Sequence, residues 1–217
     1  MKKLRLGEFE RNSLVVFAIT MIANVLSYLY QIVMGNVLTP ADYGTVNTLL
    51  SLSVVVGVPS GIISALTATY TAKYHAHGET FAIAAFMHGM LRVAAVLAAI
   101  VFVVGALLSR PIAHVLQIDD PHYVTVVMVL VASNCLGPVF SSTLQGVKRF
   151  IPYSMNSVLS FAFRLLLGVI FVWLGWGIPG ALAALILAAC LTMLYCLFKS
   201  RDLFFAPVKE KLALDRT

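Results

Sequence analysis

Long apolar stretches alternate with short polar breaks along the whole chain. The hydrocarbon layer of a membrane is about 30 Å thick and takes about 20 helical residues to cross. Six stretches meet this length, and they cover residues 13–35, 46–70, 81–108, 123–145, 153–174 and 178–198. The breaks hold proline, glycine and charged residues, which end helices and form turns. The pattern therefore predicts an all-α fold, a polytopic membrane protein with a six-helix transmembrane bundle.

The composition is that of a membrane protein. Of the 217 residues, 60% are hydrophobic and 11% are charged, whereas about 25% of the residues of an ordinary soluble domain are charged. This excludes a soluble globular protein, and six spans leave no room for a separate catalytic domain. We expect residues 1–198 to form one transmembrane lobe and residues 199–217 to form a cytoplasmic tail or a linker between lobes.

The basic residues predict the orientation of the spans. Cytoplasmic segments of membrane proteins carry an excess of lysine and arginine. If the N-terminus is cytoplasmic, Arg110 is the one basic residue in an outside segment, while Arg92 and Arg164 lie within spans and the rest of the 15 lie inside. Both termini are therefore predicted to be cytoplasmic, in a multi-pass protein of the inner (cytoplasmic) membrane. The basic residues form no single face, so no nucleic-acid partner is expected.

Two arginines lie deep within predicted spans. Arg92 and Arg164 each follow the start of their span by eleven residues, which places both about 16 Å deep. A charge at this depth costs about 2.5 to 3.5 kcal/mol and normally faces a cavity or a partner. No Asp or Glu lies well inside a span, and a guanidinium is well suited to phosphate. We expect both arginines to bind an anionic head group in a central cavity. Bonding to backbone carbonyls, or snorkelling to an interface, is the alternative.

Polar residues at helical spacing form stripes on three spans. On the first span, Asn24, Tyr28 and Gln31 share an arc with smaller polar residues. Serines and threonines form similar stripes on the second and fifth spans. A water-accessible cavity explains all three, and we expect Asn24, Tyr28 and Gln31 to contact sugar or water there. Hydrogen bonding between helices is the alternative explanation, above all for the serines and threonines.

No metal or cofactor site is predicted. His75 and His77 have no cysteine or carboxylate at ligand spacing, and the three cysteines lie inside apolar stretches, where a disulfide framework is not expected. His88 lies one turn before Arg92 on the same helix face. It is a candidate proton carrier for coupling, or else a packing residue.

Gly57, Pro59 and Gly61 interrupt the second span. Small residues four apart allow close helix contact, and a proline in mid-span kinks a helix. A kink is therefore predicted here, either as a bending hinge or as a static feature.

Two families of membrane enzymes share fragments with the chain, but the chemistry of both is incomplete. Residues 59–61 and 109–110 are similar to fragments of the lipid phosphate phosphatases. Ile62 stands where those enzymes need a histidine, and His114 is one residue too close to the preceding arginine. Rhomboid-type proteases need a Gly-x-Ser-Gly, in which Val58 replaces the first glycine, and a histidine that the sixth span lacks. We predict that the chain is not an enzyme, with action on a polyprenyl phosphate as the disfavoured alternative.

Several short motifs resemble one family of membrane transporters. They are Leu38-Thr39-Pro40-Ala41-Asp42-Tyr43-Gly44, the interrupted second span closing at Ala72-Lys73, Leu144-Gln145-Gly146 with Lys148 and Arg149, and Gly177-x-x-Gly180-Ala181. This spacing is similar to that of polysaccharide exporters and lipid-linked oligosaccharide flippases of the multidrug/oligosaccharidyl-lipid/polysaccharide (MOP) superfamily. Thr39 departs from the pattern, because a glycine commonly follows the leucine in that family.

The resemblance implies a transporter lobe for polysaccharide biosynthesis. Members usually hold two lobes of about six spans and move a polyprenyl-pyrophosphate-linked oligosaccharide by alternating access, and this chain resembles the N-terminal lobe. Its implied partners are the lipid-linked saccharide, membrane lipids and a second lobe, supplied by a homodimer or a separate chain. Intramembrane arginines without acids favour a pyrophosphate-bearing lipid over a cationic drug. The alternative is a non-transporting membrane partner, or an isolated half-protein fragment of such a system.

Overall fold

The computed structural model describes residues 2–118 and 120–204, with side chains described from Ser13 onward. Within these residues the chain forms eight helices and no strand. They are α1 (Lys2–Val37), α2 (Pro40–Val56), α3 (Val58–Ala76), α4 (Thr80–Leu107), α5 (Ser109–Val115), α6 (Pro121–Gly146), α7 (Phe150–Trp173) and α8 (Gly177–Phe204). Five are long and apolar enough to cross a membrane, and the bent pair α2 and α3 can make a sixth span. The predicted all-α fold is confirmed.

Several elements differ from the sequence prediction. Helix α1 begins at Lys2, before the predicted span 13–35, and α2 and α3 together cover Pro40 to Ala76, beyond the predicted 46–70. The break after the third span contains the short helix α5, in a segment predicted to be a turn. Helix α8 continues to Phe204, six residues past the predicted end of the last span, because the polar residues beyond 198 still pack: Ser200 is buried, and the Lys199 carbonyl accepts a hydrogen bond from Arg149. Residues 205–217 of the predicted tail lie outside the described part of the chain.

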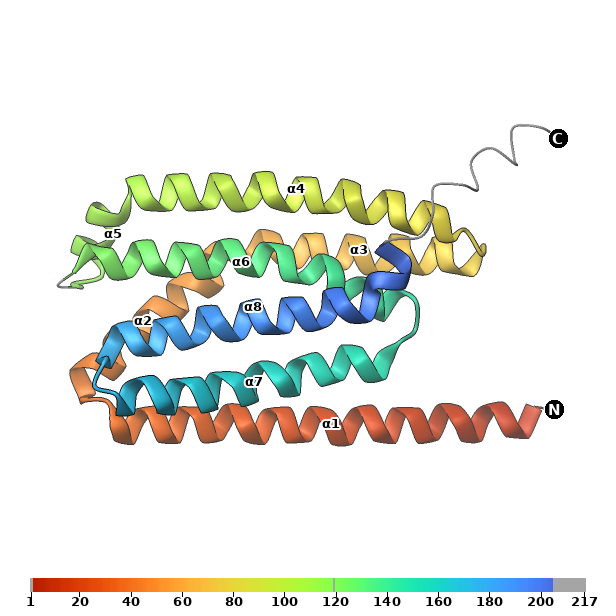
Figure 1. Cartoon of the computed structure of the whole chain (residues 1–217), viewed down its shortest axis with the longest axis horizontal. Helices are drawn as coiled ribbons and strands as arrows, with labels where there is room; N and C mark the ends of the chain where they lie inside the picture. The colour runs from red at the N-terminus through yellow and green to blue at the C-terminus, as the bar shows by residue number, and fades with distance from the viewer. Residues whose placement is uncertain (1, 119, 205–217) are drawn as a thin grey trace.

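The helices form a bundle in which α1 begins and α8 ends at the same end (Figure 1). We call this the terminal end. The α3–α4 and α6–α7 turns lie there as well, and the α1–α2 and α7–α8 turns lie at the opposite end. This arrangement is the one expected for an even number of crossings, while the cytoplasmic placement of the terminal end stays a prediction.

Helix α6 lies in the middle of the bundle and packs against α2, α3, α4, α5, α7 and α8. Its buried residues include Val127, Met128 and Leu144. In lipid the hydrophobic effect contributes little free energy to the association of helices. Close van der Waals packing of small residues therefore stabilises the bundle. Gly146 shows this: a Cβ there would lie 2.9 Å from the Ala68 carbonyl oxygen and 2.7 Å from the Thr71 Cβ, both on α3.

Helix α2 starts with a side-chain cap. The Thr39 hydroxyl oxygen accepts a hydrogen bond from the Asp42 backbone N–H at 3.2 Å and donates to the Asp42 carboxylate at 2.8 Å. Pro40 takes a first-turn position where its missing N–H costs nothing. Threonine, at the position where the resembled family commonly has glycine, is thus a helix-capping residue.

The second span is broken at Gly57, where α2 and α3 meet at 49°. Pro59 has no N–H to continue the hydrogen-bond ladder of α2, and its ring disfavours a straight helix. The predicted kink is present, whereas its bending during a functional cycle stays a prediction for Gly57, Pro59 and Gly61. A Cβ at Gly57 would lie 2.8 Å from the Ser53 carbonyl oxygen, while Gly61 faces open space.

Candidate functional site

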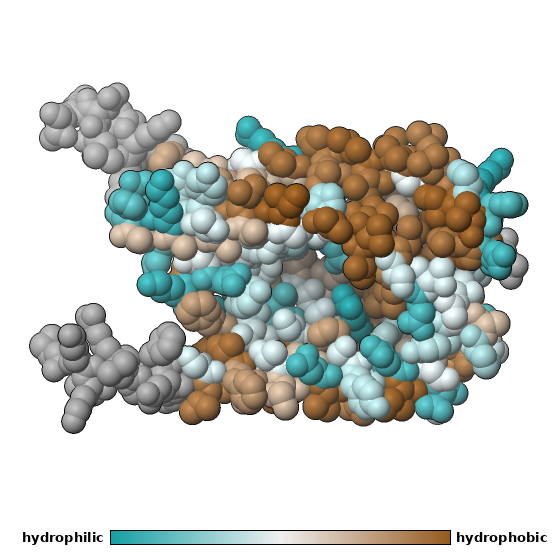
Figure 2. All heavy atoms as spheres, turned by 180° about the vertical axis from the view of Figure 1, so that it is seen from behind, coloured by the Kyte–Doolittle hydropathy of each residue, from teal (hydrophilic) through white to brown (hydrophobic). Residues whose placement is uncertain are grey.

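A polar cavity lies inside the bundle between α2, α3, α6, α7 and α8. Its volume is about 590 Å³, within the range of about 300 to 1,000 Å³ of small-molecule sites. The face shown in Figure 2 is hollowed between α3 and α1, with hydrophilic side chains in the hollow. The polar side chains that line the cavity are Ser53, Ser60, Ser133, Asn134, Ser141, Asn156, Ser160, Arg164 and Thr192. Such a polar interior within an apolar bundle marks a site for a hydrophilic ligand.

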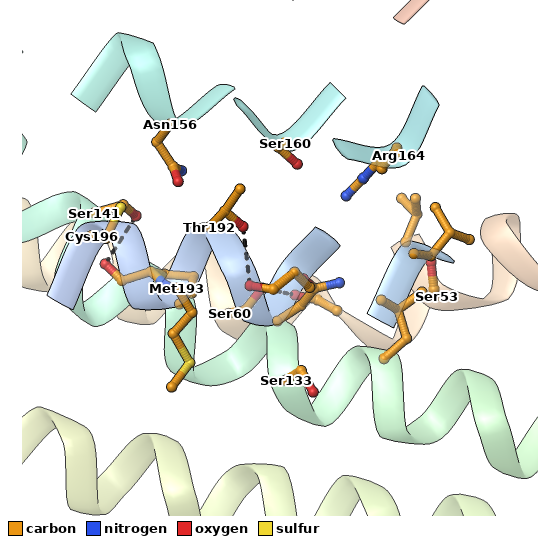
Figure 3. Close-up of a pocket in the computed structure, with 18 of the residues that line it drawn as sticks. Ser53, Ser60, Ser133, Ser141, Asn156, Ser160, Arg164, Thr192, Met193 and Cys196 are labelled. Carbon is orange, nitrogen blue, oxygen red and sulfur yellow. Dashed lines mark hydrogen bonds between the residues drawn. The ribbon is translucent and has the colours of Figure 1, made fainter. Parts of the chain in front are cut away.

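Helix α7 contributes a row of three polar side chains to this cavity. Asn156, Ser160 and Arg164 follow one another at intervals of four residues, so they share one face of the helix. In Figure 3 they project from α7 toward α8. Arg164 is the one charged residue among the described residues that line the cavity. The row therefore presents an amide, a hydroxyl and a cation along one wall.

Arg164 is partly buried and incompletely paired. Its Nε has no hydrogen-bond partner among the described residues. The guanidinium carbon lies 5.5 Å from the centroid of the Phe161 ring. The hydroxyl of Tyr30, on α1, is also buried without a hydrogen-bond partner and is close enough to Arg164 to interact with it electrostatically. With no carboxylate in the described lining, the cation is free to bind an anion.

Five hydroxyl groups in the lining donate to backbone carbonyls three or four residues earlier in the chain. These donors are Ser53, Ser60, Ser133 and Thr192, at 2.6 to 2.9 Å, and Ser141, at 3.5 Å. Because each hydroxyl hydrogen is used in this way, the oxygens offer only lone pairs to a ligand. The wall is therefore rich in acceptors, which suits a ligand that carries O–H groups.

Arg92 lies outside this cavity. It is exposed on α4, a helix that contributes no side chain to the lining. No hydrogen bond or ion pair joins it to another residue in the described ranges. Arg92 and Arg164 lie near the middle of their helices but are not brought together in one cavity of this chain. A head-group contact from Arg92 stays a prediction.

The predicted polar stripe on α1 also lies on the outside of the lobe. Asn24, Tyr28 and Gln31 are exposed, Tyr28 by 65% of its surface, and none of them lines the cavity. Their contact with sugar or water stays a prediction.

His88 joins two helices. Its ring stacks on Phe204 of α8 with centroids 4.3 Å apart, and its Nδ1 lies 2.8 Å from the Ala84 carbonyl oxygen. This geometry is that of a packing histidine, and a coupling role stays a prediction. Within the described residues, no group of three or more His, Cys, Asp or Glu side chains is placed to hold a metal ion.

Sequence reasoning did not single out five polar residues of the lining, nor Tyr30 beside Arg164. The five are Ser133, Asn134, Ser141, Asn156 and Thr192. Asn156 precedes Ser160 and Arg164 at the same four-residue spacing, so the stripe on the fifth span already contained the signal. The sequence holds no such signal for Asn134 and Tyr30. Their helices show polar or aromatic residues on several faces, and the sequence does not say which face meets the cavity.

The fold and the cavity define a multi-pass helical membrane protein with a polar interior site. Residues 9–215 match the model of the family described as polysaccharide biosynthesis protein. The chain belongs to this family. A comparison with curated protein sequences finds no match.

Two solved structures share the fold. One is a MOP superfamily transporter from Pyrococcus furiosus Vc1 (DSM3638), 17% identical, with a TM-score of 0.68 over 89% of this chain and 44% of that chain. The other is a multidrug resistance MATE family transporter of the MOP superfamily in an outward-facing conformation, 18% identical, with a TM-score of 0.66 over the same shares. The chain thus spans less than half the length of these transporters and has the fold of one lobe.

Proposed function

We propose that the chain is one lobe of a transporter that moves a polyprenyl-pyrophosphate-linked oligosaccharide across the cytoplasmic membrane by alternating access. The observation that carries this proposal is the cation of Arg164 in a polar cavity whose described lining holds no carboxylate. A pyrophosphate supplies the missing counter-charge and accepts the paired hydrogen bonds of a guanidinium. A cationic substrate would be repelled from the same position.

The rest of the lining supports a saccharide beside the phosphate. The acceptor oxygens of Ser53, Ser60, Ser133 and Thr192 match the O–H groups of a sugar, and Asn156 can both donate and accept. The cavity volume of about 590 Å³ suits a head group, so the long lipid chain stays outside, in the membrane. Family membership and the fold of the MOP transporters support the same assignment.

A complete transporter requires a second lobe. Because α1 begins and α8 ends at the same end of the bundle, a second copy or a separate lobe enters the membrane in the same orientation. The exposed polar residues Asn24, Tyr28, Gln31 and Arg92 are then placed to face that lobe or the cleft between the lobes, since polar side chains in lipid seek partners.

The proposal is tested by assembly and transport together. The full chain is purified in mild detergent, its stoichiometry is measured by light scattering, and it is reconstituted in vesicles with the lipid-linked oligosaccharide. We expect a dimer, or co-purification of a second six-span chain, and transfer of the saccharide between leaflets, detected by its protection from an added glycosidase. A monomer that transfers nothing contradicts autonomous transport.

That outcome favours the second candidate function, a non-transporting membrane partner. The exposure of Asn24, Tyr28 and Gln31 on α1 is the observation behind it, because polar contact surfaces between helices have this composition. In that case substitution of these residues disrupts a complex, while substitutions in the cavity have no effect.

The orientation of the lobe gives a separate prediction. In a background without cysteines, His75→Cys at the terminal end is expected to react with an impermeant thiol reagent only after the cell membrane is permeabilised. Arg110→Cys, at the opposite end, is expected to react in intact cells. His75 and Arg110 are both exposed, so a difference in labelling between the two cysteines does not come from burial. The reverse labelling pattern contradicts cytoplasmic termini.

A further inference from the structure

A second depression lies on the outer surface of the lobe, between α7 and α8. Its volume is about 680 Å³, and its walls are almost wholly apolar, with Leu159 and Phe163 on α7 and Leu194 and Phe198 on α8. Leu194 and Phe198 are 56% and 60% exposed. The groove and the polar cavity use different faces of α8. The groove is therefore a separate feature of the lipid-facing surface.

One end of this groove carries a cation. Arg201 lines the groove, and its guanidinium carbon lies 4.7 Å from the centroid of the Phe198 ring. The Asp202 carboxylate lies 3.8 Å from Arg201 Nε and 3.6 Å from Arg149 Nη1, so two arginines share one acid. The backbone carbonyl oxygen of the nearby Lys199 accepts a hydrogen bond from Arg149 Nη1 at 3.1 Å. The cluster is cationic overall, and its ion pairs are exposed and therefore weak and exchangeable.

The groove has the length of one membrane leaflet. Its lining extends along α8 from Leu191 to Arg201, which corresponds to about 15 Å of helix, half of a hydrocarbon layer of about 30 Å. Arg201 lies at the terminal end of the bundle, where α8 ends. A lipid with its head group at Arg201 thus has its chain in the groove down to the middle of the membrane.

We propose that the groove between α7 and α8 binds one anionic phospholipid of the leaflet at the terminal end. An acyl chain lies along Leu159, Phe163 and Leu194, and the phosphate is held by Arg201 with Arg149. Basic sites between transmembrane helices recognise acidic head groups in this way. A polyprenyl carrier is longer than the groove, so a phospholipid fits it better. This site is independent of the proposed transport function.

Native mass spectrometry of the full chain in mild detergent tests the site. The protein is titrated with phosphatidylglycerol or with phosphatidylcholine of the same acyl chains. We expect one phosphatidylglycerol to bind in preference to phosphatidylcholine. Arg201→Gln is expected to weaken phosphatidylglycerol binding about fivefold, the effect of one basic residue at a membrane surface, and to leave phosphatidylcholine binding unchanged. Arg110→Gln, an exposed basic residue at the other end, is the matched control and should have no effect.

A second variant tests the groove itself. Leu194→Trp fills it from an exposed position and is expected to remove the bound phospholipid while the protein stays folded. Equal binding of the two phospholipids, or equal loss in Arg201→Gln and Arg110→Gln, overturns the proposal. So does displacement of phosphatidylglycerol by equimolar polyprenyl phosphate, because the groove then belongs to the carrier lipid.

Discussion

Arg164→Gln is expected to lower transport of a polyprenyl-pyrophosphate-linked oligosaccharide by about tenfold to a hundredfold without loss of folded protein. A hydrogen bond to a charged group contributes about 1.5 to 3 kcal/mol, and each 1.4 kcal/mol is about a factor of ten in affinity. Glutamine keeps a polar side chain in the cavity but removes the charge. The measurement is transfer between leaflets in vesicles that contain the assembled transporter.

Two further substitutions sharpen this test. Arg164→Lys keeps the charge and loses the planar fork, so it should transport at an intermediate rate. Arg92→Gln makes the same chemical change at a similar depth on α4, outside the cavity. Loss of transport in Arg92→Gln as well places that arginine on the substrate path of the two-lobed assembly, and full transport removes its predicted role. Full transport by Arg164→Gln contradicts the assigned site.

Gly146→Leu is expected to prevent formation of a stable lobe. A side chain at this position meets the Ala68 carbonyl oxygen at 2.9 Å, and backbone on a packed helix has little room to shift. Even Gly146→Ala should lower the free energy of unfolding of the lobe by about 1 to 3 kcal/mol, the usual cost of overpacking. The effect is measured as the thermal unfolding midpoint in detergent and as the yield of monodisperse protein.

Gly89→Ala is the matched control for this prediction. A Cβ at Gly89 of α4 meets nothing within 4 Å, and alanine favours a helix over glycine by about 0.5 to 1 kcal/mol. Gly89→Ala should therefore leave the unfolding midpoint unchanged or raise it. An unfolding midpoint in Gly146→Leu equal to that of the wild type shows that the contact between α3 and α6 does not hold the bundle.

The sequence predicted the helices well because crossing a membrane imposes a length and a hydropathy that few other structures share. The α6 prediction of residues 123–145 agrees closely with Pro121–Gly146. Pro59 predicted the break in the second span, since a missing N–H is a local property. The angle of 49° is not local, because it depends on how α2 packs on α6 and α8 and how α3 packs on α6 and α4.

The site was less accessible to sequence reasoning. In a membrane, lipid and protein interior are both apolar, so hydropathy does not distinguish an outward helix face from an inward one. Periodicity placed Asn24, Tyr28 and Gln31 on one face, but that face lies outside the lobe. The free-energy cost of an intramembrane charge identified Arg164 and Arg92 equally, and only the packing of α7 and α4 separates them.

The contacts of α1 have a consequence for biosynthesis. Its extensive packing is against α7, with little contact to α2, so α1 pairs with a segment that is completed only at Trp173. At a synthesis rate of about 5 to 20 residues per second, α1 waits in the membrane for roughly 7 to 27 s before that partner is complete. During this interval Tyr30 and Met34, which are buried against Gly168 of α7 in the folded lobe, lack that partner. The nascent chain is therefore most open to mispairing and proteolysis before α7 inserts.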